Sequence, residues 1–274
     1  MSTNQPLEAT DTPVDATMNF CPPGEKVIFY PTDRAKSQWP YKPYPVKIHN
    51  MRQVQNELSF DRNGFVLLNQ DSACKNLYDA DEVERVYVPE VLALIQKLTG
   101  ADKVVNFGIM TRTNNPESPE GNLPAFGAHV DYGDRTVRDQ TILALGEEEA
   151  AKWLAGRYML INVWRPIKVV ESAPFALCDA STIAESDLCD SEVRGGLGDP
   201  NRPTLYGYAV SFNENQRWYY APNMRPDEVY AFKLFDSDPD AVQLTAHSAF
   251  EHPGIAEDAA PRESIEMRTI AYIL

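Results

Sequence analysis

Two residues that can bind a metal, His129 and Asp131, stand two positions apart in a segment with the pattern of a strand. Side chains alternate between the two faces of a strand, so both would point to the same face and could chelate one ion. His247, more than a hundred residues later, would complete a set of two imidazoles and one carboxylate. This set is typical of non-haem Fe(II) and leaves three coordination positions open for a co-substrate and oxygen.

The spacing of His129 and Asp131 alone also fits a surface His–Asp pair, or a site for zinc or manganese. His252 is a second candidate for the distal ligand, but it stands beside Pro253 in a loop-like stretch. His247 instead ends a strand-like segment. We therefore expect His129, Asp131 and His247 to be the metal ligands.

A second group of polar residues opens the last strand-like segment of the chain. Arg262 and Ser264 would share one face of that strand, and together they suit a carboxylate. A guanidinium grips a carboxylate through two parallel hydrogen bonds, and a hydroxyl can add a third. Arg268 shares the same face, so Arg268 is the alternative anchor, and Glu266 would be its partner if Arg262 is the anchor.

The order of these motifs is the order found in 2-oxoglutarate oxygenases and in isopenicillin N synthase. The chain from about residue 46 onward also resembles a fungal and bacterial oxygenase family that includes cephem-methoxylase components, gibberellin-desaturase-like proteins and a meroterpenoid oxygenase that forms an endoperoxide. The matching blocks span 61–65, 127–132, 162–166, 177–180, 217–220 and 262–268, with His247 before the last of them.

The resemblance implies a double-stranded β-helix (jelly-roll) core, Fe(II), 2-oxoglutarate as co-substrate, O2 and a role in secondary metabolism. One departure is the spacing of the anchoring arginine, which in many such enzymes follows the distal histidine by about ten residues. Arg262 follows His247 by fifteen, and an insertion over 251–261 would account for the difference. We favour Arg262 with Ser264 over Arg268.

The expected reaction is C–H abstraction on a bulky, apolar secondary metabolite of the terpenoid, meroterpenoid or polyketide type. Hydroxylation, desaturation and endoperoxidation are all open outcomes. We expect Tyr132, Asn162 and Trp218 to line the substrate pocket, because aromatic side chains suit such a ligand. Two alternatives are a non-catalytic component of a two-protein oxygenation system and an Fe(II) oxidase that needs no 2-oxoglutarate.

The expected architecture is mainly β with flanking helices. Apolar residues at three- and four-residue spacing predict a helix over 79–99, closed by Gly100. Residues 147–154 predict a short helix. Strands are expected over 104–110, 157–165, 174–178, 207–212, 217–221, 228–235 and 264–274. Residues 1–18 are polar and lack periodicity, which predicts a disordered tail before a single domain over 19–274.

The composition restricts the partners. Twenty-five basic and 40 acidic residues in 274 give a formal charge of −15. This charge disfavours nucleic acid and anionic membrane surfaces. No apolar run approaches the length of a membrane span, and four scattered cysteines are typical of free thiols in a reducing compartment. We expect a cytoplasmic protein with a small-molecule substrate, and the sequence leaves a homodimer open.

Overall fold

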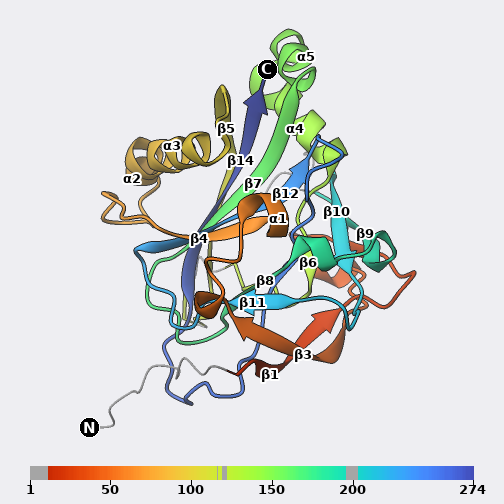
Figure 1. The fold of residues 1–274 in the computed structure, drawn as a ribbon, viewed down its shortest axis with the longest axis vertical. Coiled ribbons are helices and arrows are strands. Elements are labelled where there is room, and N and C mark those ends of the chain that lie inside the picture. Colours follow the sequence, from red (N-terminus) through yellow and green to blue (C-terminus); the bar gives the residue numbers. More distant parts are fainter. Residues whose placement is uncertain (1–11, 116, 119–121, 196–202) are drawn as a thin grey trace.

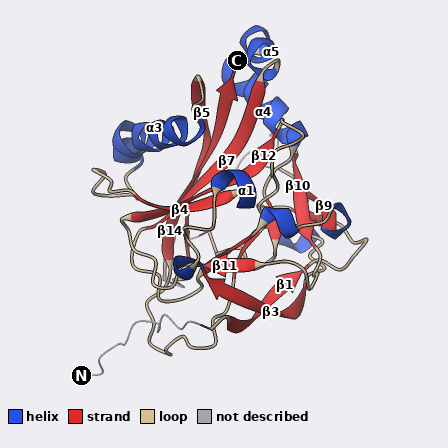
Figure 2. Cartoon of the chain, viewed as in Figure 1, coloured by secondary structure: helices blue, strands red, loops and turns tan. Residues whose placement is uncertain are grey.

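The structure is a computed structural model that describes residues 12–115, 117–118, 122–195 and 203–274. Strands dominate the described part of the chain and helices lie at its periphery (Figure 2). Five α-helices are described, namely α1 (Phe60–Asn63), α2 (Ala80–Glu82), α3 (Val88–Thr99), α4 (Asp134–Leu145) and α5 (Glu147–Leu154). The mainly β architecture with flanking helices is confirmed.

Two sheets form the body of the molecule (Figure 1). The larger sheet consists of β1 (Val14–Phe20), β2 (Val27–Phe29), β3 (Lys42–Asn50), β6 (His129–Val130), β8 (Phe175–Cys178), β9 (Leu188–Val193), β10 (Leu205–Val210), β11 (Trp218–Tyr220) and β13 (His247–Ala249). Its order is β1-β3-β11-β8-β13-β6-β10-β9-β2. This order places β6 directly between β13 and β10, although β6 and β13 are far apart in the chain.

The smaller sheet is antiparallel throughout. Its strands are β4 (Phe65–Asn69), β5 (Lys103–Thr113), β7 (Arg157–Pro166), β12 (Glu228–Asp236) and β14 (Glu263–Ile273), in the order β4-β12-β7-β14-β5. The two sheets share one apolar core, to which β1, β8, β7 and β14 all contribute. The two facing sheets, the larger of which is mixed, make the jelly-roll core.

The smaller sheet is covered on its other face as well. Ile161 and Val163 of β7 pack against Val91 and Ile95 of α3 in a second apolar cluster. Because both faces are covered, β7 is buried along almost its whole length. This explains why its sequence is a nearly continuous apolar run and not an alternating one.

The helix predicted over 79–99 is present but has a wider turn in its middle. Asp79 caps α2 by accepting hydrogen bonds from two backbone N–H groups, and Gly100 ends α3 with φ +70°. Residues 83–87 between α2 and α3 form a π-helical turn. Pro89 has no N–H to donate into the preceding turn, so a local widening of the helix is expected there.

The N-terminal prediction was wrong from Val14 onward. Residues 1–11 lie outside the described part, but β1 begins at Val14 and pairs antiparallel with β3. Val14, Ala16, Met18 and Phe20 alternate with polar residues, and their side chains face the core. This alternation with a period of two could have predicted the strand. The extent of the single domain stays a prediction.

No helix in the described ranges is long and apolar enough to cross a membrane.

Gly64 links the first helix to the site described below. It ends α1 with φ +86°, a conformation that glycine adopts without steric cost. A Cβ at Gly64 would overlap with Oγ1 of Thr245, which donates a hydrogen bond to the Gly64 carbonyl. Thr245 lies two residues before His247, and its own carbonyl contacts the His247 ring.

We expect Gly64→Ala to lower the free energy of unfolding by more than the backbone strain alone, which is about 1–2 kcal/mol. Gly100→Ala is the matched control, because Gly100 also has a positive φ but a Cβ there meets no atom within 4 Å. Urea denaturation of both variants measures the difference. Equal losses in the two variants would contradict a clash with Thr245.

Candidate metal centre and co-substrate pocket

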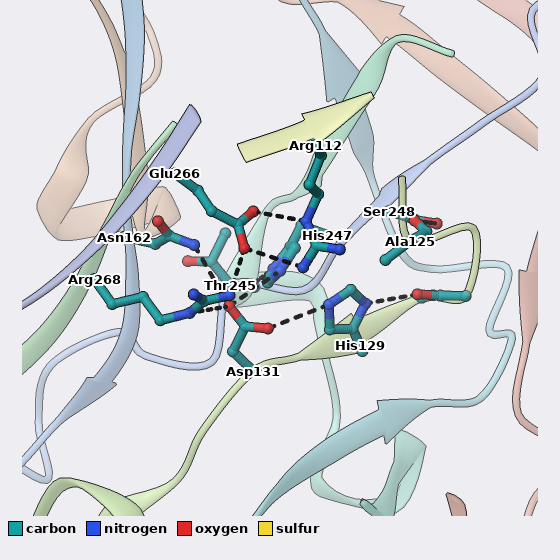
Figure 3. Close-up of polar contacts among 12 residues, drawn as sticks. Arg112, Ala125, His129, Asp131, Asn162, Thr245, His247, Ser248, Glu266 and Arg268 are labelled. Carbon is teal, nitrogen blue, oxygen red and sulfur yellow. Dashed lines mark hydrogen bonds and ion pairs between the residues drawn. The ribbon is translucent and has the colours of Figure 1, made fainter. Parts of the chain in front are cut away.

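The three predicted metal ligands lie together (Figure 3). His129 opens β6 and Asp131 follows it, while His247 opens β13 directly opposite His129. Nε2 of His129 is 3.4 Å from Oδ1 of Asp131, and Nε2 of His247 is 3.8 Å from Oδ2. One ligand atom from each residue lies within 4.8 Å of the other two. Strand pairing therefore joins a local motif to a residue distant in sequence.

Both imidazoles are held by backbone carbonyls. Nδ1 of His129 lies 2.7 Å from the Gly127 oxygen, and Nδ1 of His247 lies 3.2 Å from the Thr245 oxygen. A carbonyl only accepts, so each Nδ1 carries a proton, and Nε2 of each ring faces Asp131. Burial, and then the neighbouring His129, lower the pKa of His247 to about 3, which keeps this ring neutral at physiological pH. A neutral ring with its proton on Nδ1, such as that of His247, has Nε2 free to bind a cation.

Asp131 is held on one of its two oxygens. Oδ2 accepts from Nδ2 of Asn162 and from Nε of Arg268, each at 3.4 Å. Burial alone would raise the pKa of Asp131, but Arg268, His129 and His247 together hold that pKa well below its usual range. Asp131 is therefore ionised and oriented without any metal.

Arg268 belongs to a buried chain of alternating charges. It forms an ion pair with Glu266, and Arg112 of β5 binds the same carboxylate through two hydrogen bonds of 3.0 and 3.1 Å. Burial would raise the pKa of Glu266, but Arg112 and Arg268 lower it to about 2. The pairing of Arg268 with Glu266 agrees with the expectation that Glu266 is its partner.

Arg262, unlike Arg268, forms no ion pair with a carboxylate of the described residues. It is 1% exposed, its guanidinium lies 5.6 Å from the Trp164 ring centre, and one of its nitrogens donates to the Ala173 carbonyl at 2.8 Å. Among the described residues, no carboxylate pairs with Arg262, and neither its Nε nor Nε1 of Trp164 has a hydrogen-bond partner. Burial lowers the pKa of Arg262 to about 9, and the nearby Arg112 adds to this. Arg262 directly precedes β14, and Ser264, also 1% exposed, is the second residue of that strand.

The three residues predicted to line the substrate pocket are separated. Tyr132 lies under the Arg268 guanidinium, 5.5 Å from ring centre to Cζ. Asn162 bonds Asp131 instead of facing free space. Trp218 pairs with Cys178, whereas His247 pairs with the neighbouring Leu177. Adjacent strand residues face opposite ways, so Trp218 lies on the other side of the sheet from His247.

Trp218 is instead a core residue, packed edge-on against Phe20. The rival ligand His252 also lies apart from the cluster. Its Nε2 is 3.1 Å from the Tyr220 hydroxyl and its Nδ1 accepts from the Gly254 N–H. Both ring nitrogens of His252 are thus engaged, and the structure brings only His247 to the His129–Asp131 pair.

Known proteins resemble this chain along most of its length. A family described as an oxidoreductase/YMDC permease-like domain matches residues 18–272. The Fe(II)/2-oxoglutarate-dependent dioxygenase NvfI of Aspergillus novofumigatus is 33% identical over 246 residues, 87% of each chain. The α-ketoglutarate-dependent dioxygenase PhiK of a fungal species is 30% identical over 237 residues, 82% of each chain.

Solved structures agree with the sequence comparisons. A structure of NvfI, described as an iron and α-ketoglutarate-dependent endoperoxidase, superposes with a TM-score of 0.86 at 30% identity. The superposition covers 96% of this chain and 98% of that one. The chain belongs to this family of Fe(II)/2-oxoglutarate-dependent dioxygenases. The dioxygenase thus uses Fe(II), 2-oxoglutarate and O2, as the sequence predicted.

Sequence reasoning missed several groups around the site. Trp164 lies within a matching block but was not predicted as a site residue. Its indole N–H is an unpaired donor beside Arg262. No sequence motif indicated Arg112 as a site residue, because Arg112 reaches Glu266 only through the pairing of β5 with β14. The carbonyls of Gly127 and Thr245 each lie two residues before a candidate histidine ligand, which is the only regularity that would have indicated them.

Proposed function

We propose that His129, Asp131 and His247 hold the Fe(II) of this dioxygenase and that Arg262 anchors 2-oxoglutarate. The observation that carries the proposal is the convergence of one ligand atom from each of the three residues within 4.8 Å. Two imidazoles and one carboxylate match the preference of non-haem Fe(II) and leave positions open for other ligands.

The unpaired donors around Arg262 suit the distal carboxylate of 2-oxoglutarate. A buried guanidinium without an anion is costly, and a carboxylate removes that cost. Nε of Arg262 and Nε1 of Trp164 are unpaired donors among the described residues, and the Ser264 hydroxyl lies two residues after Arg262 near the start of β14. Arg268 is less suited, because Glu266 and Asp131 already engage it. We therefore assign the anchor to Arg262 with Ser264 and Trp164.

Fe(II) and 2-oxoglutarate supply the oxidising chemistry of this enzyme class, which removes hydrogen from a substrate C–H bond. The protein positions the reactants and excludes water. Phe175 and Phe232 flank the His247 ring, with ring centres 5.5 and 4.9 Å away, and close one side of the metal centre. The carbonyl contacts to both Nδ1 atoms and the donors on Asp131 fix the three ligands before any metal binds.

We place the substrate beside Tyr132, where Phe107 packs edge-on at 5.7 Å. Gly108 of β5 pairs with Arg268, and a Cβ at Gly108 would meet no atom within 4 Å. This open, partly aromatic surface next to the metal suits a bulky apolar secondary metabolite of the terpenoid, meroterpenoid or polyketide type. Related proteins described as hydroxylase/desaturase and as endoperoxidase support hydroxylation, desaturation or endoperoxidation as the outcome.

Succinate release tests the proposed function. Purified protein with Fe(II), 2-oxoglutarate and air is incubated with a panel of apolar terpenoid and polyketide scaffolds and, separately, with polar metabolites of similar mass. We expect at least one apolar scaffold to raise succinate formation above the substrate-free rate. Stimulation by the polar set alone would contradict the proposed substrate class.

Four buried cysteines that form no disulfide support a cytoplasmic site of action as part of this proposal. The homodimer that the sequence left open stays a prediction.

A further inference from the structure

The two oxygens of Asp131 have different surroundings (Figure 3). Oδ2 lies 3.4 Å from a donor on Asn162 and 3.4 Å from a donor on Arg268. Oδ1 faces Nε2 of His129 at 3.4 Å, and Oδ2 faces Nε2 of His247 at 3.8 Å. The Asn162 and Arg268 donors both converge on Oδ2, and neither of them contacts Oδ1.

Arg268 is itself held from several directions. Its guanidinium pairs with Glu266, lies over the Tyr132 ring and is about 5% exposed. Glu266 cannot turn away, because Arg112 binds both of its oxygens. Arg112 in turn donates to the Leu123 carbonyl at 2.9 Å. Four alternating charges thus run from β5 through β14 to the carboxylate after β6.

A chain of this kind is a poor stabiliser by itself, since desolvation of buried ions offsets most of their attraction. What this chain of charges does provide is a defined geometry. The planar guanidinium can bridge two carboxylates at fixed angles, which a lysine ammonium cannot do. Asn162 adds a neutral donor to the same oxygen that Arg268 engages.

We propose that Arg268 and Asn162 are positioning residues that occupy Oδ2 of Asp131, so that Asp131 offers Oδ1 alone to the metal. Glu266, clamped by Arg112, fixes Arg268 for this task. The inference rests on the proposed function. Its consequence is that the carboxylate takes one coordination position and three remain for 2-oxoglutarate and oxygen.

Arg268→Lys tests this inference, because it keeps the charge near the metal and removes only the planar bridge. Co(II) serves as the probe, since its d–d spectrum reports coordination geometry. We expect the Co(II) dissociation constant to rise about tenfold or more, as for other residues that orient metal ligands, and the d–d spectrum to change. Asn162→Leu should change the spectrum in the same direction with a smaller loss of affinity.

Arg52→Lys is the matched control, because Arg52 also grips a buried carboxylate, that of Glu228, through two nitrogens. It should lower thermal stability and leave the Co(II) affinity and spectrum unchanged. If Arg268→Lys and Asn162→Leu bind Co(II) with the wild-type affinity and spectrum, the inference is overturned. If the wild type itself binds no Co(II), the proposed metal site fails first, so the two failures are distinguishable.

Discussion

Replacing His247 by Ala is expected to abolish iron binding and reduce activity to background. The variant loses one of only two imidazoles in the cluster. Removal of a residue that merely orients a ligand costs about 10–100-fold in metal affinity, so removal of a ligand should cost more than about 100-fold. Anaerobic Fe(II) titration with calorimetric detection measures this, and succinate formation measures activity.

His252→Ala is the control for this experiment. His252 contacts the Tyr220 hydroxyl and the Gly254 N–H, away from the cluster. We expect this variant to bind Fe(II) as the wild type does. Retention of iron by His247→Ala together with its loss in His252→Ala would show that the distal ligand is misassigned.

Replacing Arg262 by Ala should lower the affinity for 2-oxoglutarate at least about tenfold and leave iron binding intact. Each hydrogen bond to a charged group is worth about 1.5–3 kcal/mol, and the variant removes a charge-assisted pair of them. The titration is followed anaerobically through the charge-transfer band of the iron complex with 2-oxoglutarate. The metal ligands are untouched, so the Fe(II) affinity serves as an internal control.

Arg268→Ala is the informative comparison for this second prediction. Arg268 is the partner of Glu266 and Asp131, so its removal should lower the free energy of unfolding and disturb the metal site. At saturating Fe(II), it should bind 2-oxoglutarate better than Arg262→Ala does. The reverse result would exchange the roles of the two arginines. Wild-type affinity for 2-oxoglutarate in both variants would mean that neither arginine anchors it.

The cluster of His129, Asp131 and His247, which we propose as the metal site, could be predicted from the sequence. His129 and Asp131 need only the alternation of one strand, and His247 needs only the order of motifs along the chain. The sequence pattern could not choose between Arg262 and Arg268, because alternation along the last strand predicts the same face for both. Their contacts differ: Glu266 and Asp131 engage Arg268, whereas no described carboxylate pairs with Arg262, and this difference supports the proposal that Arg262 is the anchor.

Trp218 shows how a one-residue difference in register changes an assignment. Its aromatic character fitted a pocket, but β11 pairs with β8 so that Trp218 faces the opposite way from His247. No sequence pattern indicates which of two adjacent aromatic residues will face the metal. Asn162 was predicted to line the substrate pocket, but its side chain contacts Asp131 instead.

The sequence did not predict helix α4 (Asp134–Leu145), for a different reason. Its buried positions include Thr136 and Thr141, while Ile142 and Leu143 are 41% and 63% exposed. The apolar residues therefore do not mark the buried face, and the 3.6-residue period is hidden. Strand β1 carried a readable alternation, but its polar surroundings led to the prediction of a tail that extends too far.

A crystal structure of the protein grown anaerobically with Fe(II) and 2-oxoglutarate tests the central claim most directly. We expect Nε2 of His129, Nε2 of His247 and one oxygen of Asp131 at about 2.0–2.3 Å from the iron, by analogy with other imidazole and carboxylate ligands. The distal carboxylate of 2-oxoglutarate should contact Arg262. Iron bound through His252, or a co-substrate carboxylate on Arg268 with Arg262 unoccupied, would contradict the proposed site.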